Sequence, residues 1–250
     1  MPLPPVLFED EFLIAFDKPS GLPVGTDRKN QQRENLTGMV REKMGEGIAN
    51  VHRIDEEVSG LVLYAKTKPA LDFISGQFQS KTVIKLHHAL VVGIPAVDEY
   101  TVDFFLKEDE GKPGTVCVVK KHGWACETSF TVAAKFPQPA GRPGFATVEC
   151  RPATGRMHQI RVHLASSGTP ILNDPLYGEG AQLFLSDLKR GYKGRDDEKP
   201  LISRLALHAG ALTFTHPLSR EKMTLTSSLP NDFAVAVKYL EKFASGKNRG

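Results

Sequence analysis

The segment HRID, residues 52–55, sets a basic side chain, Arg53, two residues before the carboxylate of Asp55. Free aspartate titrates near ~3.9, so a side chain of this kind is ionised at neutral pH. Ionised carboxylates serve as nucleophiles in several classes of enzyme. A lone Arg-x-Asp is more often a surface ion pair, so this spacing by itself leaves both catalysis and ion pairing open.

A second polar block, residues 154–163, reads TGRMHQIRVH and combines a glycine-led turn with cations. Arg156 lies in that turn, and Arg161 lies in the helix expected after it. A cation at the start of a helix favours a phosphate contact, although a glycine-led turn before a helix is also common architecture. Arg161 likewise has two interpretations, a role in a site or an anchor that ties its helix to a neighbouring acid.

Four blocks of sequence together resemble one family. HRID followed by SGLVLYAK resembles the HRLD...SGLLLLAK signature of RluA-type RNA pseudouridine synthases. EDEFLIAFDKPSGLPV, residues 9–24, is similar to the family's opening strand and KP-x-G-L-x-V turn. ATGRMHQIRVHLASSGTPILNDPLYG, residues 153–178, resembles its TGR-x-HQ-x-RVHL block, and RLALHAGALTFTHP, residues 204–217, its closing strand. Because the blocks also occur in the family's order, the likeness extends over most of the chain.

The resemblance implies an RNA pseudouridine synthase, an isomerase of the intramolecular transferase type. In this reaction the bond from ribose C1′ to N1 of uridine breaks, the uracil turns while still held, and C5 is joined to C1′. Asp55, at the position of the family's essential aspartate, would attack the nucleotide or stabilise charge at C1′. Arg161 matches the family arginine that pairs with this aspartate and keeps it charged.

The same resemblance implies how the substrate is held. Enzymes that act on a base must expose it, and Arg53 matches the arginine that fills the space left by the turned-out nucleotide. A phosphate contact and a plain salt bridge are alternative roles for Arg53. We expect RNA, either rRNA or tRNA, as the partner and no external cofactor. The expected substrate-binding residues are Arg53, His52, Arg156, His158 and Gln159.

The histidines do not form a metal-binding signature. Those at positions 52, 158, 163 and 208 lie in separate blocks, without the close carboxylate or cysteine partners of a zinc centre. We therefore expect no metal site, and we assign these histidines to structural or RNA-backbone roles.

One departure from the family pattern falls at a position expected to be catalytic. KTVIKLHHALVVG, residues 81–93, resembles the family's K-x-Y-x-A-L-V-x-G stretch, but His87 stands where most members carry the tyrosine that stacks on the uracil. Imidazole can stack and can move a proton, but its face is smaller and it titrates near ~6.5. Val58 and Met157 are smaller departures, because each replaces a hydroxyl residue that is usual there.

The resemblance implies an α+β fold: a central mixed, largely antiparallel sheet in two joined halves, with helices on the outer faces. Residue patterns predict a hairpin in 6–19 and helices at 36–44, after Thr67, at 157–167 and from Asn231. Strands are predicted at 59–66, 82–93, 100–106, 115–119, 128–134, 145–150, 205–214 and 222–226. We expect one catalytic domain over residues 1–250, without a separate N-terminal RNA-binding module.

Composition sets broad limits on these interpretations. The chain has 250 residues, 40% of them hydrophobic and 24% charged, which excludes collagen-like, coiled-coil and wholly disordered classes. A net charge of +3 is only weak support for a nucleic-acid partner. Three cysteines without a C-x-x-C pair suit reduced thiols, and no signal peptide or membrane span is evident. We expect a cytoplasmic monomer.

Three functions remain in competition. The first is an active synthase that turns a uridine out of structured rRNA or tRNA. The second is an RNA-binding or RNA-folding protein of the same fold whose catalysis is weak or lost because His87 replaces tyrosine. The third, a small-molecule hydrolase built on Asp55, has little support, because no paired acid or nucleophile–base arrangement accompanies that residue.

Overall fold

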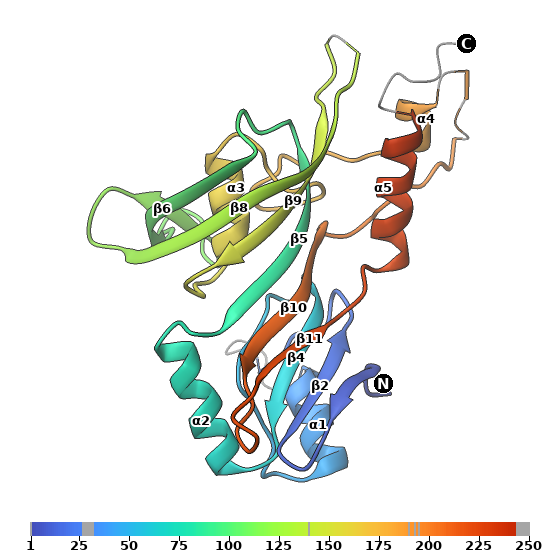
Figure 1. The fold of residues 1–250 in the computed structure, drawn as a ribbon. Helices are drawn as coiled ribbons and strands as arrows, with labels where there is room; N and C mark the ends of the chain where they lie inside the picture. Colours follow the sequence, from blue (N-terminus) through green and yellow to red (C-terminus); the bar gives the residue numbers. More distant parts are fainter. Residues whose placement is uncertain are drawn as a thin grey trace. The chain divides into compact units, whose positions relative to one another are not determined.

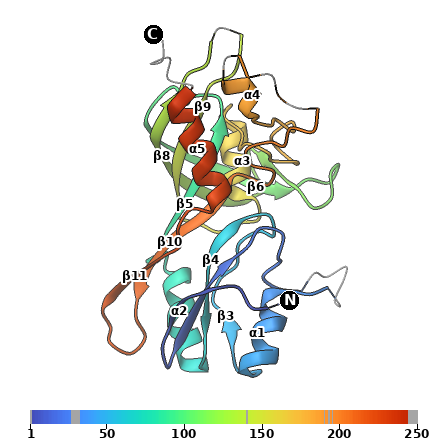
Figure 2. The ribbon, with the colours of Figure 1, turned by 90° about the vertical axis from the view of Figure 1, so that its right-hand side faces the viewer.

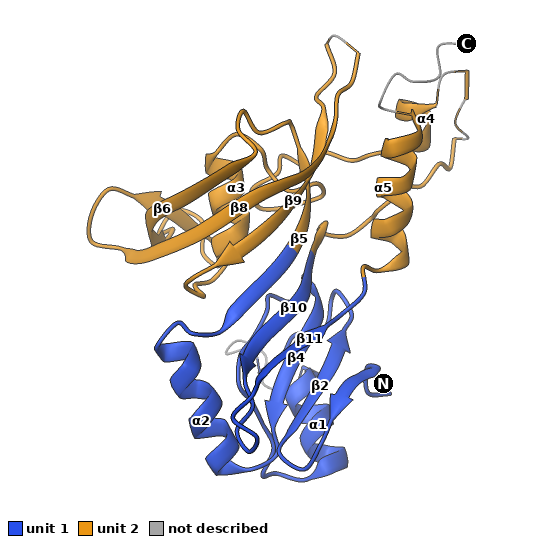
Figure 3. Ribbon diagram, in the orientation of Figure 1, with its two compact units in different colours: residues 1–87, 208–228 blue, residues 88–207, 229–250 orange. Residues whose placement is uncertain are grey.

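The computed structural model describes residues 2–26, 33–139, 141–189, 191–192, 194 and 196–243. Figure 1 shows the path of the chain and its elements. The chain divides into two compact units (Figure 3), which are described separately. Unit 1 comprises Met1–His87 and His208–Ser228, and unit 2 comprises His88–Leu207 and Leu229–Gly250.

Unit 1 contains a mixed sheet in the order β1-β2-β4-β10. Strands β4 and β10 run parallel, whereas β1–β2, β2–β4, β3–β4 and β10–β11 are antiparallel. The parallel pair joins segments that lie far apart in the sequence. The strands are β1 (Val6–Glu9), β2 (Leu13–Lys18), β3 (Ala49–Asn50), β4 (Ser59–Ala65), β10 (Leu207–Thr215) and β11 (Lys222–Thr226).

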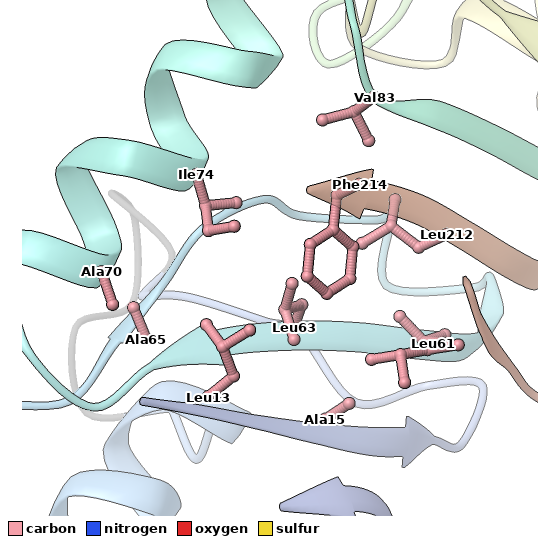
Figure 4. Close-up of a cluster of buried hydrophobic side chains, with 11 residues drawn as sticks. Leu13, Ala15, Leu61, Leu63, Ala65, Ala70, Ile74, Val83, Leu212 and Phe214 are labelled. Carbon is pink, nitrogen blue, oxygen red and sulfur yellow. The ribbon is translucent and has the colours of Figure 1, made fainter. Parts of the chain in front are cut away.

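Strand β4 is buried along its whole length because both faces of the unit 1 sheet are covered. Its side chains alternate: Leu61 and Leu63 pack in one cluster with Leu13 of β2, and Val62 and Tyr64 pack in another. Helix α2 (Lys68–Gln79) closes the first cluster through Ala70 and Ile74, as Figure 4 shows. Helix α1 (Leu36–Met44) closes the second, and Figure 2 shows the two helices on either side of the strands. A continuous apolar run is what a strand covered on both faces requires.

Unit 2 is built on the strand order β5-β9-β8-β6-β7, with antiparallel β8–β9, β6–β8 and β6–β7 pairs. Helix α3 packs on this sheet through Val162, which joins Leu106, Val116 and Cys126 in a buried cluster. The strands and helices are β5 (Ile84–Val92), β6 (Glu99–Glu108), β7 (Val116–Val119), β8 (Trp124–Phe136), β9 (Phe145–Pro152), α3 (Gln159–Ser166), α4 (Leu185–Leu188) and α5 (Asn231–Phe243).

The predicted class, an α+β fold with a largely antiparallel mixed sheet, is confirmed. Helix α1 and strand β11 have the predicted bounds, and Thr67 caps α2 by accepting a hydrogen bond from the Ala70 N–H group. Helix α3 begins at Gln159 rather than at residue 157, because His158 takes a left-handed conformation with φ of 53°. The short elements β3 and α4 were not predicted.

Two further expectations concern the thiols and the membrane. Cys117, Cys126 and Cys150 form no disulfide among the described residues. Among the helices of the described ranges, none combines the length and the apolar character that crossing a bilayer requires.

Candidate functional site

Asp55 lies in a turn between β3 and β4 in unit 1. Its backbone carbonyl accepts a hydrogen bond from the Val58 N–H group at 3.2 Å, and its side chain is half-buried. Val58, which replaces the usual hydroxyl residue, is 3% exposed and packs inward. The turn therefore presents the Asp55 carboxylate just ahead of the most buried strand of the unit.

A buried lysine fixes this turn. Lys18, at the end of β2, has no exposed surface, and its ammonium group donates to the carbonyls of Pro19 (2.9 Å), Leu22 (2.7 Å) and Glu56 (2.9 Å). Three carbonyl acceptors match the three donors of an ammonium group. Because Glu56 directly follows Asp55, the network ties the KP-x-G turn of the first motif to the residue beside the carboxylate.

Two more hydrogen bonds hold the turn from the same side. The Ser20 hydroxyl donates to the Glu57 carbonyl at 2.6 Å, and the Gly21 N–H group donates to the Glu56 carbonyl at 2.9 Å. The Glu56 side chain also pairs with Arg33 at 2.5 Å on the surface. The backbone on the C-terminal side of Asp55 is thus bonded at two successive residues.

The start of β4 is locked onto β10. Gly60 has φ of 115°, and a Cβ atom there would lie 2.3 Å from the Ala209 carbonyl oxygen, so only glycine fits. Beside it, Ser59 Oγ lies 3.0 Å from Nδ1 of the buried His208, whose Nε2 lies 3.2 Å from the Ser227 carbonyl oxygen. With the carbonyl as acceptor, Nε2 carries the proton and Nδ1 accepts from the serine. His208 therefore has a structural role, one of the two expected.

The structure gives His52 and Arg53 different surroundings. His52 Nε2 accepts a hydrogen bond from the Leu63 N–H group at 3.1 Å, and its ring stacks on Phe78 at 5.4 Å. Burial, with the nearby charge of Lys85, lowers the pKa of His52 to about 3, so it is neutral. Arg53 is exposed, and its guanidinium forms no ion pair within the described residues. Of the two, Arg53 is the side chain available to a ligand.

His87 lies on strand β5 as the last residue of unit 1 and is half-buried. Lys85, two residues earlier, has its side chain on the same face of the strand because residues i and i+2 share a face. Burial lowers the pKa of Lys85 to about 8. The position predicted to stack on uracil is thus accompanied by a partly desolvated cation.

In unit 2, Arg161 forms a buried fork with Asp174. Both side chains are 0% exposed, and Arg161 donates from Nε to Oδ2 and from Nη2 to Oδ1, each at 2.8 Å. Burial alone would raise the pKa of Asp174, but the Arg161 guanidinium and the N–H groups of Leu176 and Tyr177 lower it overall. Nη1 takes no part in this fork. The anchoring role, one of the two interpretations of Arg161, is therefore present.

The side chain of Gln159 forms hydrogen bonds with other residues of unit 2. It is 4% exposed; its Nε2 donates to the Glu127 carbonyl at 2.9 Å and to Thr128 Oγ1 at 3.0 Å. Its Oε1 accepts from Thr154 Oγ1 at 2.8 Å and from the Arg156 N–H group at 3.1 Å. These bonds fix the glycine-led turn against β8. Arg156 itself is exposed, with no side-chain ion pair in the part of the chain that the structure describes.

His158, the last residue of this turn, contacts Tyr177. Its Nδ1 lies 2.9 Å from the phenol oxygen of Tyr177, which also accepts from the Val116 N–H group at 2.9 Å. The guanidinium carbon of Arg161 lies 5.4 Å from the centroid of the same ring. Met157, the second minor departure from the family pattern, packs against the buried cluster beneath α3. Tyr177 therefore links β7, the α3 N-terminus and the Arg161–Asp174 fork.

No group of three or more His, Cys, Asp or Glu side chains within the described ranges is placed to hold a metal ion. His52, His158 and His208 instead contact a backbone group, an aromatic ring or a single side chain.

Sequence reasoning had not singled out Lys18, Ser20, Asp174 and Tyr177 as functional. All four lie inside the quoted motif blocks, in KPSGL and in NDPLYG. The signal was present, but lysine and aspartate are usually surface residues, and a linear motif does not show which of its members are buried.

The comparisons with known proteins agree on one family. The family model described as "RNA pseudouridylate synthase" matches residues 12–166. Ribosomal large subunit pseudouridine synthase C of Vibrio vulnificus (strain CMCP6) is 34% identical over 237 residues, covering 94% of this chain and 69% of that protein. Dual-specificity RNA pseudouridine synthase RluA of the same organism is 32% identical over 228 residues, covering 91% and 83%.

Solved structures show the same fold. Human RNA Pseudouridylate Synthase Domain Containing 1 superposes with a TM-score of 0.68 at 23% identity, covering 92% of this chain and 86% of that one. Human RNA Pseudouridylate Synthase Domain Containing 4 gives 0.68 at 24% identity, covering 94% and 92%. At this identity the likeness concerns the fold.

Proposed function

Because this chain belongs to the RNA pseudouridylate synthase family, we propose that Asp55 is its catalytic carboxylate and that its substrate is a uridine turned out of structured ribosomal RNA. The chain is an RNA pseudouridine synthase, an isomerase.

The overall reaction conserves every atom. The C1′–N1 bond breaks, a C1′–C5 bond forms, the proton on C5 is lost, and a proton is gained at N1. No electrons enter or leave, so the chemistry needs no external redox group. It does need a group that meets C1′ while the uracil is detached, and an ionised carboxylate can do so by attacking the nucleotide or by stabilising positive charge there.

The observation that carries the proposal is the fixed turn of Asp55. Carboxylates are common on protein surfaces, but here the backbone beside one is bonded by Lys18, Ser20 and Gly21 and is followed by the buried strand β4. A group held in place before the substrate arrives loses little entropy in the reaction. This arrangement supports a catalytic carboxylate over a surface ion pair.

Exposed cations support base flipping and phosphate binding. Arg53 lies two residues before Asp55 with an exposed guanidinium, so it can occupy the space of a turned-out base. Arg156 is exposed at the α3 N-terminus, where N–H groups and a cation favour a phosphate. His87 would stack on the uracil in place of tyrosine. Arg161 remains catalytic by motif resemblance. His52, His158 and Gln159 would act by holding the surrounding backbone, because their polar atoms contact protein groups.

We take ribosomal RNA as the target because several relatives carry names that specify the ribosomal large subunit, including synthase D of Neisseria meningitidis serogroup B (strain ATCC BAA-335 / MC58), 32% identical over 233 residues. The dual-specificity relative makes tRNA the second place to look. We also propose one catalytic domain that uses both units, since the family match runs through both. A cytoplasmic monomer near 27.5 kDa is the expected form, which light scattering and cell fractionation can check.

The test is genetic and chemical. The gene is deleted in its host, pseudouridine is mapped across rRNA and tRNA, and the strain is complemented with wild type, Asp55→Asn or Asp72→Asn. Asp72 is a matched control, an exposed carboxylate in unit 1 that pairs only with Lys68 on α2. We expect a lost site that wild type and Asp72→Asn restore and Asp55→Asn does not. Restoration by Asp55→Asn would sink the catalytic role and favour an RNA-binding or RNA-folding function.

A further inference from the structure

The loop between β7 and β8, two strands that pair with opposite edges of β6, carries unpaired positive charge. Residues 120–123 read KKHG, and Lys120, Lys121 and His122 are all exposed. The two lysines form no ion pair or hydrogen bond with any described residue. In the loop between β6 and β7, the acidic side chain of Glu110 is neutralised by Lys107, at 2.5 Å. The light-green loop in Figure 1 leads directly into β8.

An exposed indole follows these cations. Trp124 is the only tryptophan of the chain and keeps 42% of its surface exposed. Leu106 of β6 pairs with both Val118 and Trp124, and cross-strand partners share one face of a sheet. Leu106 is fully buried, whereas Val118 is 39% exposed. Trp124 and Val118 therefore flank the buried edge of the unit 2 core as an open apolar ledge.

This ledge is continuous with the α3 N-terminus. Trp124 and Cys126 lie on one face of β8, and Cys126 packs in the cluster that Met157 contacts. Met157 is the neighbour of the exposed Arg156. Glu127 belongs to the opposite face by strand alternation. Within unit 2, an aromatic face is thus bordered by Lys120 and Lys121 on one side and by Arg156 on the other.

We propose that the ledge at this loop, Trp124 with Lys120, Lys121 and Val118, binds an unpaired stretch of the RNA substrate, with one base stacked on the indole and the lysines on the flanking phosphates. Every base has a π-face, and basic surfaces with exposed aromatic rings suit single-stranded RNA. A duplex would not fit, because its bases are already stacked. The inference rests on the proposed function in that the same RNA is the substrate.

The single tryptophan makes binding directly measurable. The full chain is titrated with a synthetic RNA hairpin whose loop holds unpaired uridines, and in parallel with a fully paired RNA of equal length. Stacking of a base on Trp124 quenches its fluorescence. We expect saturable quenching by the looped RNA and much weaker quenching by the duplex. No quenching by the looped RNA at saturation would overturn the proposal.

Variants distinguish the contribution of the Trp124 ring to RNA binding from that of the two lysines. Trp124→Ala should weaken binding of the looped RNA, followed by anisotropy of a labelled probe, by about 5- to 150-fold, the range for one base–aromatic stack. Trp124→Phe should recover part of that loss. Lys120→Ala/Lys121→Ala should reduce the slope of log affinity against log salt by about 1.4, because each single-strand phosphate contact contributes about 0.7. The matched control Lys238→Ala/Lys242→Ala, on α5 of the same unit, should leave the slope unchanged.

Turnover distinguishes this inference from the proposed function. In single-turnover assays on rRNA from the deletion strain, Trp124→Ala should need more enzyme for half-saturation yet reach the wild-type rate, whereas Asp55→Asn should bind and not react. Unchanged RNA affinity in both the Trp124→Ala and the Lys120→Ala/Lys121→Ala variant would overturn the role of the ledge and favour a protein partner there, while leaving the assignment of Asp55 unaffected. Intact quenching with an active Asp55→Asn would instead overturn the catalytic assignment alone.

Discussion

Lys18 donates a hydrogen bond to the Glu56 carbonyl at 2.9 Å, which joins the end of β2 to the residue beside Asp55. The lysine has no exposed surface, so its charge is stabilised only by protein groups, chiefly three carbonyl oxygens. A buried charge is tolerated only when it is well bonded. The position of the Asp55 turn and the burial of this lysine therefore depend on each other.

Replacing Lys18 by methionine should lower the free energy of unfolding, although the two side chains are similar in size. Lys18→Met leaves three carbonyls without their donor, and we expect a loss of about 3–5 kcal/mol in the free energy of unfolding. Single-turnover activity should fall by at least about tenfold, because misplacing a reacting group is costly. Urea denaturation measures the first effect. The control is Lys68→Met, which removes the exposed ion pair between Lys68 and Asp72 on α2 and should change the free energy of unfolding by less than about 0.5 kcal/mol. A loss of stability in Lys68→Met as large as that in Lys18→Met would contradict the role of the Lys18 network.

The contact of Gly60 with Ala209 predicts that alanine is destabilising at Gly60 but not at Gly76. Gly60→Ala places a methyl group 2.3 Å from a carbonyl oxygen at φ of 115°, so we expect a loss of about 2–5 kcal/mol from overpacking and backbone strain. Gly76→Ala, in α2 with open space around it, should stabilise the protein by up to about 1 kcal/mol. Thermal unfolding of both variants is the measurement. A neutral Gly60→Ala would mean that β4 and β10 are not so close.

These two cases show what the sequence could and could not predict. The apolar run of β4 and the Thr67 cap of α2 are local signals, and both elements formed as predicted. The parallel pairing of Ser59 with His208 joins residues 149 apart and leaves no local trace. Nor does sequence show that Lys18 is buried, because lysine is usually a surface residue. Local propensity therefore predicted the elements, and tertiary packing decided the bonds that hold the site.

The family resemblance supplied the catalytic candidates, but not their supports. Asp55 and Arg161 were identified through motif position, whereas the bidentate partner of Arg161, Asp174, lies 13 residues further along, past the glycine that ends α3. A motif records which residues occur together, not which of them touch. The geometry of unit 2 was needed to find that Arg161 is part of a buried fork.

That fork predicts strong energetic coupling. Arg161→Met and Asp174→Leu should each cost about 3–5 kcal/mol, because each removes one partner of a buried ion pair. The double variant should cost clearly less than the sum, since both single variants lose the same pair of hydrogen bonds. Urea denaturation of the wild type, the two single variants and the double variant at neutral pH measures the free energies of unfolding for this double-mutant cycle. The exposed pair Lys68 and Asp72 is the control, with an expected coupling below about 0.5 kcal/mol. Additive losses at Arg161 and Asp174 would contradict the buried pair.

The replacement of tyrosine by His87 is testable by restoring the family residue. His87→Tyr should retain or raise the single-turnover rate, because phenol offers a larger face for the uracil. His87→Ala should lower the rate by about 5- to 150-fold, the range for loss of one stacking partner. His87→Phe separates stacking from proton transfer, since it keeps a face and has no exchangeable proton. Circular dichroism confirms folding; an inactive but folded His87→Tyr would show that the histidine has a role of its own.

His163 predicts how stability depends on pH. The ring is fully buried, and neither nitrogen has a hydrogen-bond partner among the described residues. Burial lowers its pKa to about 4, although the charge of Asp103 opposes this. Between pH ~6.5, the ordinary pKa of histidine, and pH about 4, His163 is protonated in the unfolded chain but neutral in the folded chain. The free energy of unfolding therefore falls as the pH falls through this window, by up to about 1.4 kcal/mol per pH unit.

His163→Phe should remove this contribution and leave those of His52 and His88, whose pKa values burial also lowers. It should keep or raise stability at pH 7.5 because no hydrogen bond is lost. Urea denaturation at half-unit intervals from pH 7.5 to 4.5 measures the slope. His122→Asn is the control, an exposed histidine with φ of 61° that asparagine tolerates, and its slope should match wild type. A His163→Phe slope as steep as that of wild type would mean that His163 titrates alike in the folded and unfolded chains.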